Sequence, residues 1–254
     1  MKASLNYQAL KNGQPVSDAL VVEVPVQLFI EEEPLTVSMC TPTHIREWAY
    51  GILFTEGIIR SADEVLSYSE EEVDHQITIR VSLSNAANAV TNKRSLLSVS
   101  ACGICGKTAF EPPTLRDEHE ADDEQSSMTL REDIDAMMKK LREAQVIFDE
   151  TGGCHAAGVF NKNQELLFAS EDIGRHNAVD KVVGSLVINQ QLREAKYLMV
   201  SGRVSYEIVA KCFAAGIPNL AAVSSPSSLA VDYAKELGLS LFAFCRENRV
   251  TQYA

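Results

Sequence analysis

The sequence predicts a mixed protein, with an α/β domain in its C-terminal half and a smaller α+β domain in its N-terminal half. Two observations predict this division. From residue 155 onward, short apolar runs alternate with helical segments, which is typical of β-α-β units around a mainly parallel sheet. Residues 111–126 contain seven acidic residues and only one arginine, and they also contain two prolines. This composition is typical of a solvated linker. We therefore expect an N-terminal domain over residues 1–126 and a C-terminal domain over residues 127–254.

The N-terminal half contains four predicted strands and one predicted helix. Alternating residues rich in valine and isoleucine predict strands over 21–30, 35–39, 65–69 and 76–83. The first two are joined by a polar turn and can pair with each other. The helix is expected over residues 43–57, with Thr41 as its N-cap, Pro42 at its first position and Gly57 at its end.

The C-terminal half begins with a predicted helix and continues as alternating strands and helices. Thr129 and Glu132 fit a capping box, and an apolar stripe from Ile134 to Phe148 predicts one continuous helix that Gly152 ends. Strands are then expected over 155–160, 165–170, 197–202, 219–224 and 239–244. Helices are expected over 177–188, 206–216 and 228–238.

Composition excludes several classes of function. The formal net charge of −12 argues against non-specific binding to nucleic acid or to anionic lipid, because both need a basic surface. No apolar run is long enough to cross a membrane, and the first residues lack the apolar core of a signal peptide. We therefore expect a cytoplasmic protein whose six cysteines are reduced thiols rather than a disulfide framework.

Four loops that follow predicted strands of the C-terminal half carry arginine, histidine and serine side chains. In open α/β sheets, ligands bind outside the carboxyl ends of the strands, so these loops are expected to share one edge. Arginine side chains and free N–H groups at helix starts bind phosphate, and the sequence lacks glycine-rich Rossmann and Walker motifs. We predict an anionic ligand there, a nucleotide or another phosphate ester. The alternative is that each residue is structural, with serines as N-caps and Asp172 paired with an arginine. The residues concerned are Arg175, His176, Ser201, Arg203, Ser205, Ser224, Ser225, Ser227, Arg246 and Arg249.

The segment "CGICG" places Cys102 and Cys105 two residues apart, and its chemistry has four interpretations. A zinc site needs three or four ligands, and neither a second CxxC nor a deaminase-type His-x-Glu is present, so no metal site is expected. A thioredoxin-like redox pair belongs in a βαβ unit, which this segment precedes. An inert pair is the third interpretation. The fourth is a carrier thiol, whose pKa Lys93, Arg94 and Lys107 could lower and whose persulfide a second cysteine could relay.

Seven stretches of the sequence together resemble the formate dehydrogenase accessory sulfurtransferases, the FdhD/NarQ family. They span nearly the whole chain, and the most specific are "CGICG", "DIGRHNAVDK" and "SGRVSYEIVAK" in this order. The others are "MCTPTHIREWAYGILFTEGII", "TGGCHAAGVF", "SSPSSLAV" and "FCRENR".

The resemblance implies a function, a fold and a set of site residues. Members of the family pass sulfur from a cysteine desulfurase to the bis(molybdopterin guanine dinucleotide) molybdenum cofactor before its insertion into formate dehydrogenase. They act as homodimers, with a three-layer cytidine-deaminase-like C-terminal domain that lacks the catalytic zinc ligands. The resemblance assigns the persulfide to Cys102 and Cys105, with Cys102 favoured as the nucleophile. It assigns the guanine dinucleotide to Phe244, Cys245, Arg246, Glu247, Asn248 and Arg249, together with Arg175, His176 and Arg203.

Three other functions compete with a sulfurtransferase. A cofactor chaperone would bind the guanine dinucleotide cofactor and perform no sulfur chemistry. A deaminase-like hydrolase is disfavoured by the missing His-x-Glu. A redox sensor would use Cys102 and Cys105 as a reversible disulfide and form no stable persulfide.

Overall fold

The computed structural model describes residues 1–85, 131–246 and 249–254. In these ranges it contains three β-sheets and six α-helices, and no helix there is long and apolar enough to cross a membrane. The cysteine pair at 102 and 105, the acidic segment 111–126 and the start of the predicted capping box lie outside the described residues.

A four-stranded sheet forms one outer layer of the N-terminal half, in the order β4-β3-β6-β5. Strands β3 and β6 are parallel and the other two pairs are antiparallel. Every second residue of β3 is buried, which is the alternation that predicted this strand from the sequence. All four predicted strands are confirmed: β3 (Val24–Ile30), β4 (Glu33–Cys40), β5 (Val65–Val73), which follows the short helix η1 (Ala62–Glu64), and β6 (Gln76–Leu83).

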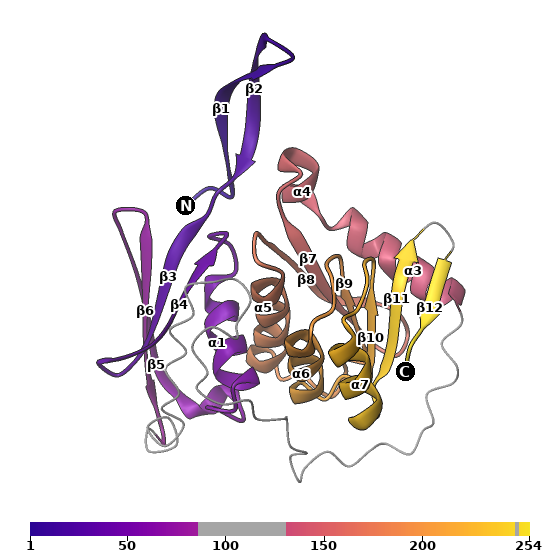
Figure 1. Ribbon diagram of the computed structural model, residues 1–254. Helices are drawn as coiled ribbons and strands as arrows, with labels where there is room; N and C mark the ends of the chain where they lie inside the picture. The colour runs from indigo at the N-terminus through magenta and orange to yellow at the C-terminus, as the bar shows by residue number, and fades with distance from the viewer. Residues whose placement is uncertain (86–130, 247–248) are drawn as a thin grey trace.

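A two-stranded hairpin precedes this sheet and projects away from the rest of the molecule (Figure 1). It consists of β1 (Ser4–Lys11) and β2 (Gln14–Val21), which the strand analysis did not predict. Its turn is Asn12-Gly13, with φ of 53° and 80°. Because an Asn-Gly pair favours positive φ at both central residues of a tight hairpin turn, the sequence did contain the information needed to predict it.

Helix α1 (Ile45–Thr55) begins later than the sequence predicts. Its N-cap is His44, at a φ of 50°, and not Thr41. Thr41 is fully buried and forms hydrogen bonds with the C-terminal half of the chain, so it is not available to cap α1. The predicted end is confirmed, because Gly57 follows the C-cap at a φ of 75°.

The six-stranded sheet of the C-terminal half has the order β12-β11-β10-β9-β7-β8. Parallel pairing is confined to β9, β10 and β11, so the prediction of a mainly parallel sheet is only partly right. Only residues 161–165 join β7 to β8, and a connection that short allows only antiparallel pairing. The strands are β7 (His155–Phe160), β8 (Leu166–Asp172), β9 (Tyr197–Val200), β10 (Asn219–Ala222), β11 (Ser240–Arg246) and β12 (Arg249–Gln252).

Helices cover both faces of this sheet (Figure 1). One face carries α5 (Arg175–Ile188), α6 (Tyr206–Ala214) and α7 (Ser228–Glu236). The other carries α3 (Arg131–Glu143), whose Ile134, Met137 and Leu141 share an apolar cluster with Phe160 and Met199 of the sheet. The sheet is therefore the middle of three layers, and a specific likeness to cytidine deaminase stays a prediction.

The prediction of a single continuous helix up to Phe148 is wrong. Helix α3 ends at Glu143, Gln145 has non-helical backbone angles, and a second helix, α4 (Val146–Thr151), follows. The cause lies elsewhere in the chain. The Glu171 carboxylate accepts hydrogen bonds from the N–H groups of Ile147 and Phe148, both at 2.7 Å, and an anion at this place stabilises a new helix start.

The two halves meet where α1 packs against α5, and one apolar core runs through both. The backbones of these helices touch at two glycines. A Cβ atom at Gly51 would lie 1.9 Å from the carbonyl oxygen of Asp180, and one at Gly184 would lie 1.8 Å from that of Glu47. Any larger residue at either position therefore forces the helices apart.

We predict that Gly51→Ala lowers the free energy of unfolding by at least about 3 kcal/mol, because the added methyl group collides with backbone that cannot move aside. Urea unfolding followed by circular dichroism measures this change. Gly158→Ala is the matched control, since the nearest atom to its Cβ is the flexible end of Leu141, at 3.0 Å. Equal losses of stability in the two variants would contradict the close backbone contact.

Candidate functional site

Four strands of the C-terminal sheet end at the same edge. Strands β9, β10 and β11 are parallel, and β8 has the same direction because β7 is antiparallel to both β8 and β9. The loops that follow these four strands therefore lie along one edge, as the sequence predicts. We call it the ligand edge. It carries the ends of β8 to β11, the first residue of β7 and the first residue of β12.

Hydrogen bonds and packing connect the loops of the ligand edge to one another. The N–H of Phe244 donates to the carbonyl oxygen of Ser224, at 3.2 Å, and the N–H of Val204 donates to that of Ser225, at 3.1 Å. Gly202, in the same loop as Val204, packs against Arg175. The edge is therefore one continuous structure from β11 to the start of α5.

Arg175 has the clearest features of a ligand-binding side chain at this edge. It is the first residue of α5, and its Nε atom is buried without a hydrogen-bond partner among the described residues. A buried N–H of a guanidinium group that lacks an acceptor is costly, so an anion from outside would stabilise it. Gly202 allows the close approach, because a Cβ there would lie 3.4 Å from two carbon atoms of Arg175.

His155 lies beside Arg175 and was missed by the sequence analysis. A Cβ at Gly202 would lie 3.3 Å from its Nδ1 atom, so both side chains pack against the same glycine. Burial lowers the pKa of His155, and the positive charges of Arg175 and Arg203 lower it further, which keeps the imidazole neutral at neutral pH. The sequence showed only an ordinary strand start at this position, and antiparallel pairing of β7 is what brings His155 to the edge.

His176 is turned into the protein between the starts of two helices. Its Nε2 atom lies 3.0 Å from the hydroxyl oxygen of Ser205 and 3.1 Å from a carboxylate oxygen of Glu207. Its side chain is almost fully buried. His176 therefore connects the start of α5 to the start of α6 beside the edge. Arg203 is exposed in the loop between β9 and α6.

The segment predicted to bind the guanine dinucleotide lies at the end of β11 and the start of β12. Phe244 has a φ of 55°, which is strained for an aromatic residue, at a bulge where the register with β12 shifts. The guanidinium group of Arg249 lies 4.5 Å from the centre of the Phe244 ring, and Arg246 is exposed. The side chain of Cys245 packs instead into the apolar cluster under α3. Glu247 and Asn248 lie outside the described residues.

The four cysteines that the structure describes, Cys40, Cys154, Cys212 and Cys245, are all buried free thiols. Burial raises the pKa of Cys154 and of Cys245 to about 11, and it raises the pKa of Cys40 and Cys212 as well. A thiol must ionise to attack or accept sulfur, so none of these four is suited to that chemistry. The predicted carrier cysteines, Cys102 and Cys105, lie outside the described residues.

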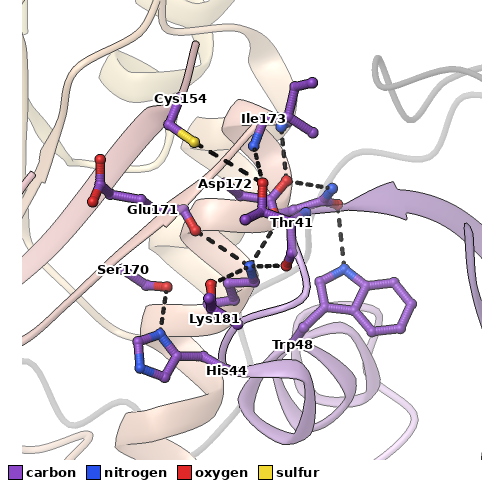
Figure 2. Close-up of polar contacts among 12 residues, drawn as sticks. Thr41, His44, Trp48, Cys154, Ser170, Glu171, Asp172, Ile173 and Lys181 are labelled. Atoms are coloured by element: carbon purple, nitrogen blue, oxygen red, sulfur yellow. Dashed lines mark hydrogen bonds and ion pairs between the residues drawn. The ribbon is translucent and has the colours of Figure 1, made fainter. Parts of the chain in front are cut away.

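Behind the ligand edge, a buried ion pair of the C-terminal half binds Thr41 of the N-terminal half (Figure 2). The Lys181 ammonium group lies 2.6 Å from a carboxylate oxygen of Asp172, and both side chains are fully buried. Lys181 also donates to the carbonyl oxygens of Thr41, at 2.9 Å, and Glu171, at 3.2 Å. The sequence analysis expected an arginine as the partner of Asp172, and that alternative is wrong. The motif "DIGRHNAVDK" supplies both members of the pair.

A second buried pair lies farther along the same interface. Lys211, which had no assigned role, lies 2.6 Å from Asp180, and Thr55 at the end of α1 contacts both. Burial raises the pKa of Asp180. These three residues come from α1, α5 and α6 and not from the loops of the ligand edge. Within residues 1–85, 131–246 and 249–254, no three metal-ligating side chains come together.

Comparisons with known proteins decide the family. The model of the FdhD/NarQ family matches residues 21–254. The chain belongs to this family.

Two relatives from different lineages show how far the similarity extends. The Sulfur carrier protein FdhD of Mycolicibacterium paratuberculosis is 40% identical over 96% of this chain and 93% of its own length. The protein of the same name from Saccharolobus solfataricus is 37% identical over 93% of this chain and 89% of its own. Family members named as sulfur carriers thus match this chain along nearly its whole length.

A solved structure supports the fold of the family. The crystal structure of a protein from Desulfotalea psychrophila, described as a formate dehydrogenase accessory protein, aligns with a TM-score of 0.72 at 23% identity. The alignment covers 98% of this chain and 95% of that one. The arrangement of both halves is therefore shared with that structure.

We predict that Lys181→Met lowers the free energy of unfolding by about 3–5 kcal/mol, because it leaves the Asp172 carboxylate buried without a counter-charge. Chemical denaturation measures the change. The control is Lys139→Met, on the exposed side of α3, which is expected to change stability by less than about 0.5 kcal/mol. Similar effects of the two substitutions would contradict a structural role of the ion pair.

Proposed function

We propose that this chain is a sulfurtransferase that carries sulfur from a cysteine desulfurase to the bis(molybdopterin guanine dinucleotide) molybdenum cofactor, before that cofactor enters formate dehydrogenase. Membership of the FdhD/NarQ family and the sulfur-carrier names of its relatives support the sulfur chemistry. The formate dehydrogenase step rests on the resemblance of the sequence to the formate dehydrogenase accessory sulfurtransferases. By the same resemblance, the protein acts as a cytoplasmic homodimer.

The observation that carries the proposal is the state of the cysteines. Four of the six are buried thiols with raised pKa values, so the carrier role falls to Cys102 and Cys105. Their CxxC spacing gives one thiol to hold the sulfur and a second within reach of it. Sulfur arriving at the protein is therefore directed to one segment of the chain.

The chemistry at these two cysteines is thiol–persulfide exchange. The Cys102 thiolate attacks the outer sulfur of the desulfurase persulfide. The donor S–S bond breaks, its electron pair leaves on the desulfurase cysteine, and Cys102 becomes the persulfide. The Cys105 thiolate then attacks Cys102, which forms a Cys102–Cys105 disulfide and releases hydrosulfide to the metal. A cellular thiol reduces the disulfide and restores the carrier.

The ligand edge supplies the binding site for the guanine dinucleotide part of the cofactor. Cationic and aromatic groups are offered there by Arg175, whose Nε has no partner among the described residues, by the exposed Arg203, and by Phe244, Arg246 and Arg249. The chain has a net charge of −12, so most of its surface is expected to repel phosphate. The arginines at the ligand edge give this part of the surface the positive charge that phosphate needs.

We predict that incubation with a cysteine desulfurase and cysteine adds sulfur to the peptide that holds Cys102 and Cys105, and that a reductant removes it. Intact-protein and peptide mass spectrometry measures the added mass. In the Cys102→Ser variant, sulfur loading and activation of formate dehydrogenase are both expected to be lost.

The matched control is Cys154→Ser, which changes a buried thiol and is expected to load sulfur like the unaltered protein. Full activation of formate dehydrogenase by Cys102→Ser would overturn the sulfurtransferase proposal. That result, with GDP binding intact, would favour the chaperone alternative.

We predict that Arg175→Ala weakens GDP binding by about tenfold or more, because a charged hydrogen bond to phosphate is lost. Isothermal titration calorimetry measures the affinity, and sulfur loading at Cys102 should continue. Arg131→Ala, on α3 at the opposite face of the sheet, is the control and should bind GDP normally. An unchanged affinity in Arg175→Ala would remove this residue from the site.

A further inference from the structure

We propose that Thr41, in the N-terminal half, is a positioning residue for the nucleotide site, because it fixes the loop that leads from β8 into Arg175. The inference rests on the proposed nucleotide binding at the ligand edge. Thr41 does not touch the ligand in this proposal. It acts on Arg175 through the backbone of the residues just before it.

The polar groups of Thr41 hold the end of β8, the loop after it and the Lys181 side chain of α5 (Figure 2). Its N–H donates to a carboxylate oxygen of Asp172 at 2.9 Å, and its carbonyl oxygen accepts from Lys181 at 2.9 Å. Its hydroxyl oxygen accepts from the N–H of Ile173 at 3.1 Å. Thr41 is fully buried, so water does not replace any of these partners.

The anchored loop is short and ends at Arg175. The N–H of Ile173 is bound by Thr41, and the next N–H, of Gly174, is bound by the other carboxylate oxygen of Asp172 at 2.7 Å. Arg175 follows directly and begins α5. Two successive backbone groups are therefore fixed immediately before the side chain whose buried Nε has no partner among the described residues.

Within the part of the chain that the structure describes, the side chains of Asn177 and Asp172 in this network already use their hydrogen-bonding capacity. Asn177 donates to Asp172 and to the carbonyl oxygen of Met39, and its own oxygen accepts from Ser38 and Trp48. A side-chain amide can form four such bonds, so Asn177 is fully satisfied. Both oxygens of Asp172 also accept two hydrogen bonds each.

Removal of the Thr41 hydroxyl therefore takes away the acceptor of the Ile173 N–H, in a partly buried place. An N–H group without an acceptor raises the free energy, so the peptide group of Ile173 is expected to rotate toward another acceptor or toward water. Such a turn displaces Arg175, which is two residues away, while the ion pair of Asp172 and Lys181 remains. Affinity for phosphate depends on where the guanidinium group lies, so it falls.

The test compares GDP affinity in Thr41→Val and Thr41→Ser. Valine has the shape of threonine without the hydroxyl, and we expect it to raise the Kd for GDP by about tenfold. Serine keeps the hydroxyl, and we expect it to restore the affinity to within about twofold of the unaltered protein. Isothermal titration calorimetry measures both, at a temperature where thermal unfolding curves show each variant to be folded.

Thr55→Val is the matched control. Thr55, at the end of α1, also contacts a buried ion pair. Its partners are Asp180 and Lys211, which lie on α5 and α6 and not in the loop before Arg175. We expect it to lower the melting temperature and leave the GDP affinity within about twofold. Equal affinities in Thr41→Val and Thr55→Val would overturn the inference and leave Thr41 a stabilising residue only.

A second variant covers the case in which Thr41→Val does not fold. A Cβ at Gly174 would lie 2.7 Å from the side-chain nitrogen of Asn177, so Gly174→Ala disturbs the same loop without changing Thr41. Weaker GDP binding in this variant supports the inference, and normal binding overturns it.

Failure of the proposed nucleotide binding gives a different result, because the unaltered protein then binds no GDP. Hydrogen exchange at the Gly174 amide then decides the inference. Thr41→Val should speed this exchange and Thr55→Val should not, and unchanged exchange in Thr41→Val would overturn it.

Discussion

The buried ion pair of Asp172 and Lys181 is the interaction on which the rest of the structure depends. Both side chains are fully buried, and an isolated charge there would be far more costly than the pair. The charges are tolerated because every hydrogen-bonding group around them has a partner. Several of these partners, Thr41 among them, come from the N-terminal half. Separation of the halves would therefore take a hydrogen-bond partner away from each member of the pair.

This constraint divides the residues of "DIGRHNAVDK" into two groups. Asp172, Asn177 and Lys181 face the junction with the N-terminal half, and the last two are four residues apart, on one side of α5. Arg175 lies at the ligand edge with a free buried Nε among the described residues. A motif that is specific for the family thus holds the two halves together as well as contributing to the candidate site.

Local sequence patterns predicted most of the elements, and contacts between distant residues decided several of the others. Alternation found β3 and the other strands of its sheet, and the order of strands and helices placed Arg175 and Arg203 at one edge. Glu171, more than twenty residues away, begins α4 by accepting two of its N–H groups, and no local pattern contains that interaction. Thr41 followed by Pro42 is typical of a helix start, yet Asp172 and Lys181 bind the backbone of Thr41 instead. His155 reaches the edge only because β7 is antiparallel.

The placement of charge also explains how an acidic protein can present a site for an anion. Lys181 and Lys211 are held in the interior by Asp172 and Asp180, so their charges act between the halves. The cations left at the ligand edge are arginines, whose planar groups suit phosphate better than an ammonium group does. Because Arg175 follows directly on a loop that Thr41 and Asp172 fix, the network at the junction also determines where the charge of the candidate site lies. Stability of the junction and geometry of the site are thus consequences of the same buried network.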